Sequence, residues 1–161
     1  MTNYNFTVIA ICLSSIALGI LLANQFHTDY VYPMDKAREI LVKVQSTSDP
    51  QTIQNDLIAV KRLLPVKGNP SIFSTGDTDF RLMQNALDAM IGTVDNISQA
   101  PSSSTEFHTG MLNVHAQATT LVFNILGATP YMYLSLPFVI ANAVWLLGII
   151  ELVRYTSTKR K

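Results

Sequence analysis

The sequence predicts an all-α membrane protein in which two transmembrane helices flank an antiparallel four-helix extracytoplasmic bundle. Residues 2–28 and 107–150 contain no Asp, Glu, Lys or Arg, and each stretch holds one long apolar run. Between these runs, apolar residues recur at three- and four-residue spacing in four consecutive segments, which is the period of one face of a helix. Little of the sequence shows the two-residue alternation of a strand, so we expect no sheet.

The two apolar runs, residues 6–23 and 131–150, are each long enough to cross a bilayer. Helices of about 18–20 residues rise about 27–30 Å, close to the thickness of the hydrocarbon core. No Lys or Arg precedes the first run, so we expect a retained signal anchor and not a cleaved signal peptide. The expected division is an N-terminus (1–5), a first span (6–25), a helical bundle (26–130), a second span (131–153) and a basic tail (154–161).

The basic tail predicts the orientation in the plasma membrane. Only one acid, Glu151, accompanies the basic residues that follow the second span, which are Arg154, Lys159, Arg160 and Lys161. Cytoplasmic segments next to a span are rich in Lys and Arg, so we expect both termini in the cytoplasm and the bundle outside. Three cations that closely follow the first span favour the opposite orientation: Lys36, Arg38 and Lys43.

The first two bundle helices have clear boundary signals. The first is expected over about residues 33–45, with Pro33 in its first turn, where a missing N–H is harmless. The second is expected to start with Asp49 as the N-cap and Pro50 at the first helical position. Pro65 helps to end the second helix.

The third and fourth helices are longer. The third is expected to begin near Asp77, and the fourth opens with Ser-Ser-Thr-Glu at 103–106, a capping-box pattern. We expect Gly127 and Pro130 to separate the fourth helix from the second span. The predicted core consists of the apolar stripes Met34, Ala37, Leu41, Val44; Ile53, Leu57, Val60, Leu64; Phe80, Met83, Leu87, Met90, Val94, Ile97; and Phe107, Met111, Val114, Ala118, Leu121, Ile125.

The fourth helix differs from the other three in having no ionised side chain between residues 107 and 126. A helix face that meets water normally carries charged residues. We therefore expect this helix to be covered on more than one side, by its sister helices and by another protein. The hypothesis is that it docks partner subunits in the membrane.

His108, Met111 and His115 are the only candidate metal ligands with a suggestive spacing. Positions i and i+7 share a helix face, and imidazole with thioether suits copper. However, seven residues of helix separate the two rings by about 10 Å along the axis, too far for one mononuclear site. Met111 also belongs to the apolar stripe, so we interpret the three as polar and core residues of a covered helix.

Several residues of the spans have structural interpretations. Ser15, Gly19 and Ala23 recur every four residues, and such a row of small residues lets another helix approach closely. Asn142 lies near mid-bilayer and is expected to hydrogen-bond another helix, because an unpaired amide is costly there. Glu151 and Arg154 are expected to form an interfacial pair. Cys12 is the single cysteine, so no intramolecular disulfide is possible.

No pattern in the sequence indicates catalysis. Gly-rich phosphate loops, HExxH, GxSxG and CxxC motifs are absent, and the net charge of zero without a basic stripe argues against nucleic-acid binding. We assign no catalytic, cofactor-binding or metal residue. Asn5 and Asn96 begin Asn-x-Ser/Thr glycosylation triplets, and only Asn96 falls in the segment expected outside.

Three functions remain open at this point. The first is a non-catalytic accessory subunit of a larger membrane complex, favoured by the uncharged helix and the small-residue row. The second is a membrane-anchored sensor, because span, four-helix bundle, span is also the layout of the ligand-binding module of bacterial chemoreceptors; here only about eight residues follow the second span. The third is a periplasmic metal-handling protein, which rests on two histidines.

The layout of two spans around a small, nearly neutral helical domain rich in Asn and Thr resembles the small accessory subunits of archaeal ammonia monooxygenase. That family is a copper-dependent membrane monooxygenase whose catalytic metal sites lie in other subunits. The resemblance implies a scaffold role, with the segment FHTGMLNVH at 107–115 and the rest of the uncharged helix facing the complex.

Overall fold

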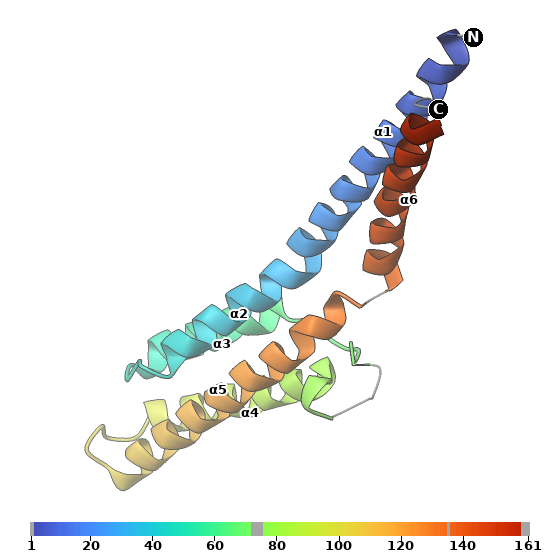
Figure 1. Ribbon diagram of the computed structural model, residues 1–161. Coiled ribbons are helices and arrows are strands. Elements are labelled where there is room, and N and C mark those ends of the chain that lie inside the picture. Colours follow the sequence, from blue (N-terminus) through green and yellow to red (C-terminus); the bar gives the residue numbers. More distant parts are fainter. Residues whose placement is uncertain (1, 72–75, 135, 159–161) are drawn as a thin grey trace. The chain divides into compact units, whose positions relative to one another are not determined.

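The computed structural model describes residues 2–71, 76–134 and 136–158, together with their side chains except those of 2–7, 136–138, 141 and 156. These ranges contain helices and no strand (Figure 1), so the all-α prediction is confirmed. The chain forms two compact units: Met1–Tyr30 with Tyr133–Lys161, and Val31–Met132. The helical elements are α1 (Thr2–Phe26), η1 (His27–Val31, a π-helical turn), α2 (Tyr32–Val44), α3 (Pro50–Leu63), η2 (Gly76–Thr78, 3₁₀), α4 (Phe80–Ser98), α5 (Thr105–Met132) and α6 (Leu136–Thr158).

In the first unit α1 and α6 pack side by side (Figure 1), and small residues lie at their contact. A Cβ at Gly148 would lie 3.0 Å from the carbonyl oxygen of Cys12 and 3.2 Å from the Cβ of Ser15. Cys12 and Gly19 are buried, so part of the predicted small-residue row faces α6. The large apolar side chains point outward instead: Ile11, Leu13, Leu18, Ile20 and Leu21 on α1, and Val139, Ile140, Leu146, Leu147, Ile150 and Val153 on α6.

Among the described residues, one helical run, Val8–Val44, contains a stretch long and apolar enough to cross a membrane. Only 11% of that stretch is buried within the protein. An apolar helix in the core of a water-soluble domain would be mostly buried, because burial is what stabilises it there.

In the second unit each of four helices packs against two others: α2 and α4 both contact α3 and α5. Side-chain pairs fix the register between neighbours, with Lys43 of α2 bridging to Asp56 of α3, and Lys61 of α3 bridging to Asp88 of α4. The predicted core residues on α2–α5 are all buried, except Phe107, which is half-buried at the first turn of α5.

The helix starts are set by local capping bonds. Asp49 caps α3 as predicted, its carboxylate accepting the backbone N–H of Thr52 at 2.9 Å. The third helix begins at Phe80, slightly later than the predicted start near Asp77. Gly76–Thr78 form a 3₁₀ segment, and Asp79 is the N-cap because its backbone is extended and its carboxylate accepts the N–H of Arg81 at 2.8 Å.

The boundaries of α5 also differ from the prediction. Ser104 caps the helix, because its hydroxyl accepts the N–H of Phe107 at 3.1 Å. The predicted capping box would instead place the cap at Ser103, one residue earlier. At the other end, α5 runs through Gly127 and Pro130 to Met132, so these two residues do not separate it from α6. Ala128 is fully buried and Met132 nearly so, and this packing offsets the lost backbone bond of an internal proline.

Candidate functional site

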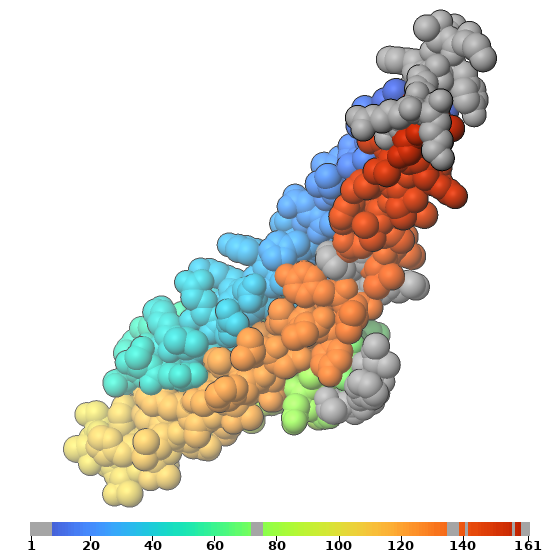
Figure 2. Space-filling view, viewed as in Figure 1, coloured from blue at the N-terminus to red at the C-terminus, as the bar shows by residue number. Residues whose placement is uncertain are grey.

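The face of α5 opposite the core is exposed along the helix. Leu112 is 70% exposed, Phe123 65% and Leu126 47%. Figure 2 shows α5, in yellow to orange, open at the molecular surface over its length. Seven other exposed positions of α5 are uncharged as well: Thr109, Asn113, Ala116, Thr119, Thr120, Gly127 and Pro130. We call this set of ten residues the α5 face.

Most polar groups on the α5 face are already hydrogen-bonded within the helix. Thr119 Oγ1 donates to the carbonyl oxygen of His115 at 2.9 Å, and Thr120 Oγ1 donates to that of Ala116 at 3.1 Å. Gln117 donates to the side-chain oxygen of Asn113 at 2.9 Å. A threonine bonded back to its own helix presents mainly its methyl group outward. The face is therefore less polar than its composition suggests.

The exposed faces of the other three helices carry paired charges. Lys36 and Glu39 lie 2.9 Å apart on α2, and Asp35 and Arg38 3.6 Å apart on the same helix. Cross-helix pairs on α3 join Lys43 to Asp56 and Lys61 to Asp88. Among the described residues of this unit, the surface of α5 is therefore the one without charged side chains beyond its first turn.

We expected α5 to be covered on more than one side. Within the described residues, other helices cover only its core side. α2 and α4 cover the stripe from Met111 to Ile125, while the α5 face has no cover from the described chain. Sister helices alone therefore do not explain the absence of charge.

A shallow groove between α4 and α5 extends the α5 face. Its volume is about 280 Å³, and Leu82, which lines it, is 46% exposed. The other lining residues are Gly76, Asp77, Ala86, Gln117, Thr120, Leu121 and Asn124. The groove adds an apolar edge from α4 to a surface that is otherwise made by α5.

The structure does not bring His108, Met111 and His115 together. His108 is exposed and stacks edge-on against Phe107, with ring centroids 5.8 Å apart. Met111 is buried in the core. His115 is directed to the α2–α3 turn, where its Nε2 lies 3.0 Å from the carbonyl oxygen of Thr47. In the described residues no three His, Cys, Asp or Glu side chains are grouped to hold a metal ion.

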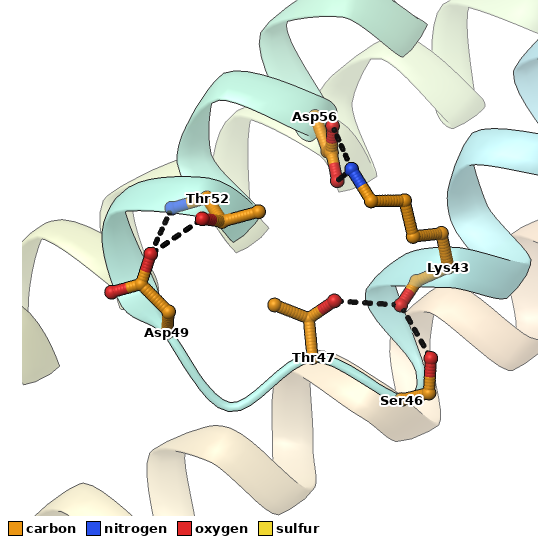
Figure 3. A network of polar contacts seen from close by, with 6 residues as sticks. All are labelled: Lys43, Ser46, Thr47, Asp49, Thr52 and Asp56. Atoms are coloured by element: carbon orange, nitrogen blue, oxygen red, sulfur yellow. Dashed lines mark hydrogen bonds and ion pairs between the residues drawn. The ribbon is translucent and has the colours of Figure 1, made fainter.

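The α2–α3 turn that receives His115 is rigidly bonded (Figure 3). The carbonyl oxygen of Lys43 accepts the hydroxyls of Ser46 at 3.0 Å and Thr47 at 2.9 Å. Asp49 then accepts both the N–H and the hydroxyl of Thr52. These bonds lower the pKa of the Asp49 carboxyl, the Thr52 hydroxyl contributing most. The contact between His115 and Thr47 therefore holds α5 against the α2–α3 turn.

Asn142 and Glu151 each have a partner on α6 itself. Asn142 accepts the indole N–H of Trp145 at 3.1 Å, and Glu151 pairs with Arg154 at 3.2 Å as predicted. Lys159, Arg160 and Lys161 of the basic tail lie outside the described residues. Asn96 of the second glycosylation triplet is exposed on α4, whereas the side chain of Asn5 is not described.

The sequence reasoning missed one pairing in the α1–α6 unit. The Tyr133 hydroxyl lies 3.2 Å from Nδ1 of His27, and the two rings are stacked 6.5 Å apart. Phe26 and Tyr30 stack beside them, with centroids 4.9 Å apart. Nothing local in the sequence links residues 27 and 133.

No protein-family model matches this chain, and neither a curated protein nor a solved structure is significantly similar to it. The α5 face and the paired helices α1 and α6 are therefore the features on which a functional proposal has to rest.

Proposed function

We propose that this protein is a non-catalytic accessory subunit of a multi-subunit membrane complex. Its helices α1 and α6 span the plasma membrane, and the four-helix unit lies outside it. The observation that carries the proposal is the α5 face, which exposes Leu112, Phe123 and Leu126 with no charge among them.

The membrane placement is supported by how α1 and α6 pack. Small residues meet in the contact and large apolar ones point away from it, with Leu21 65% and Leu147 61% exposed. This is the reverse of a water-soluble helix pair and suits a lipid surround, where close backbone approach stabilises association. The basic tail after Glu151 supports a cytoplasmic C-terminus.

The docking role is supported by the chemistry of the α5 face. Contiguous exposed apolar surface on a water-soluble domain typically marks an interaction site. Here Phe123 and Leu112 are suitable anchors, since buried aromatic side chains often dominate binding energy. Because the threonines are bonded back to the helix, covering them leaves few polar groups unsatisfied.

The resemblance of the layout to small subunits of archaeal ammonia monooxygenase names one such complex. In that setting the catalytic copper sites belong to other subunits, which fits a chain in which the His108, Met111 and His115 side chains serve separate local roles. The proposed partners are accordingly other integral membrane subunits, contacted by α5 and by the spans.

Native electrophoresis of the protein extracted from its own membranes in mild detergent tests the proposal. The wild-type chain of 17.8 kDa should migrate in a much larger complex with other membrane proteins. Phe123→Glu should release it from the complex, because a charge at the interface centre is desolvated without a partner. Val42→Glu is the matched control, since Val42 is 51% exposed on the charged helix α2, and it should leave the complex intact.

Two results would contradict the proposal. Wild-type protein that migrates alone or as a simple homodimer would favour the sensor layout described above. A complex that survives Phe123→Glu would show that α5 is not the docking surface.

A further inference from the structure

A second surface feature lies between α3 and α4, away from the α5 face. It is a groove of about 510 Å³ at the C-terminal end of α3 and the N-terminal end of α4. Lys61 and Arg62 line it from α3, and Arg81 lines it from α4. The remaining lining residues are Ile58, Val66, Gln84, Asn85 and Asp88.

The groove is built on a fixed floor. The buried amide of Gln84 donates to the carbonyl oxygens of Lys61 and Leu64, both at 3.1 Å. The following loop is tied down as well, because the N–H of Phe80 donates to the carbonyl oxygen of Gly68 at 2.9 Å. Gly68 has φ +114°, a conformation that a side chain would strain. The cations are therefore held on a defined backbone.

The groove carries an excess of positive charge. Its lining includes three cations and one acid, and that acid, Asp88, is engaged by Lys61. Arg81 lies 3.9 Å from Asp79, which is a long ion pair. Arg62 forms no ion pair with any residue in the described ranges and is exposed. Two guanidinium groups facing one cavity suit a phosphate oxyanion, which each can bind through two N–H groups.

The groove lies at the end of the four-helix unit where the chain leaves for α1 and α6. At this end of the unit α2 begins with Tyr32 and α5 ends with Met132. The same end holds the last turn of α3 and the first turn of α4. Every cation on α3, on α4 and in the loop between them lies toward this end.

An exposed apolar residue stands at the rim of the groove. Val66 is 78% exposed in the loop after α3, and its neighbour Lys67 is exposed and cationic. A single apolar side chain beside cations suits the boundary between lipid headgroups and acyl chains.

We propose that this groove binds the phosphate of an anionic lipid headgroup, with Arg62 and Arg81 as the phosphate ligands and Val66 entering the acyl boundary. The site rests on the membrane placement proposed above and is independent of docking by α5. The bound headgroup would be a link to the bilayer in addition to the proposed spans α1 and α6.

The test uses the full-length chain in nanodiscs of phosphatidylcholine with rising fractions of phosphatidylglycerol. An environment-sensitive fluorophore is attached at Val66→Cys in a Cys12→Ala background, which keeps a small residue at the α1–α6 contact. Phosphatidylglycerol should shift the label emission to the blue. Each cation near an anionic membrane strengthens association about fivefold, so Arg62→Gln with Arg81→Gln should weaken the response about 25-fold and abolish the shift.

Lys36→Gln with Arg38→Gln is the matched control. It removes the same charge from α2 near the same end of the unit, outside the groove. A shift kept in this control and lost in the groove variant supports the site. A response that is absent in the wild type, or equally reduced in both variants, overturns it. Adding inorganic phosphate to pure phosphatidylcholine discs separates the two sources: a shift there would assign the groove to free phosphate and overturn the headgroup proposal.

The single tryptophan distinguishes failure of the site from failure of the membrane placement. Trp145 lies on α6 and should be quenched by brominated phosphatidylcholine if α6 spans the bilayer. Quenching without a label shift overturns the groove alone, whereas loss of both signals overturns the membrane placement and the groove with it. Circular dichroism of both double variants checks that the helices remain folded.

Discussion

Gly110 of α5 and Ile97 of α4 pack so closely that a Cβ at position 110 would overlap Cγ2 of Ile97. The contact lies close to the loop at residues 99–104, which joins the end of α4 to the start of α5. A glycine in the first turns of a long helix destabilises it by up to about 1 kcal/mol relative to alanine. The close approach of α4 explains why a larger residue would be worse here.

Gly110→Ala should destabilise the protein by about 1–3 kcal/mol, because the added methyl group forces Ile97 or the backbone to move. Urea unfolding followed by circular dichroism measures the change. Gly92→Ala on α4 is the control, since nothing lies within 4 Å of a Cβ there, and it should stabilise by about 0.5–1 kcal/mol. Equal effects of the two substitutions would refute this account of the α4–α5 contact.

Gly148→Val should weaken the α1–α6 pair. A Cβ at this position already meets the Cys12 carbonyl oxygen at 3.0 Å and Cγ1 of Ile16 at 3.1 Å, so a branched side chain has no room and should cost about 1–3 kcal/mol. Unfolding in mixed micelles with rising SDS measures the effect. Leu147→Ala removes an outward-facing side chain instead and should change the midpoint much less. A larger effect at position 147 would mean that α1 and α6 meet on another face.

Asp49 makes the stability depend on pH in a defined direction. Its pKa is lowered in the folded state from an ordinary value of 3.8 by the bonds from Thr52. The carboxylate therefore stabilises the fold fully above that ordinary value, and the contribution is lost as the pH falls through the lowered folded value. Asp49→Asn retains an acceptor but does not titrate. The stability difference between wild type and Asp49→Asn should shrink on acidification between pH 5 and about 2, and a constant difference would contradict this role.

His115→Ala should lower stability by about 1 kcal/mol, because the hydrogen bond between Nε2 and the Thr47 carbonyl oxygen is lost. Thermal unfolding gives the change, and His108→Ala should have a smaller effect because His108 is exposed. Elemental analysis of the purified chain should give the same copper content for both variants. A fall in copper on His115→Ala alone would revive the metal interpretation.

The sequence was sufficient to predict the helices and their buried stripes. Three- and four-residue spacing specifies which face of each helix is apolar, and Leu41, Leu57, Leu87 and Val114 are all fully buried. The helix boundaries were less well predicted. Asp77 and Asp79 are both plausible caps by residue type, and the choice depends on backbone angles that the 3₁₀ segment sets.

Long-range partners could not be predicted from the sequence. The pairing of His27 with Tyr133 and of His115 with Thr47 depends on helix register and packing, which no local pattern specifies. Pro130 was misassigned for a related reason. Its tolerance inside α5 depends on the burial of Ala128 and Met132 on either side, which is a tertiary effect. The charge-free face was visible in the sequence, but its exposure was not.

The packing of α1 on α6 has a consequence for biogenesis. The two helices of this pair come from opposite ends of the chain, so under the proposed membrane placement α1 would enter the bilayer before α6 has been synthesised. During that interval Gly148 is not yet present to pack against Cys12 and Ser15, and the four-helix unit would be made and translocated before α6 follows. Ribosomes stalled before codon 148 should therefore leave α1 as a lone helix, free to associate with the small-residue face of any neighbouring span.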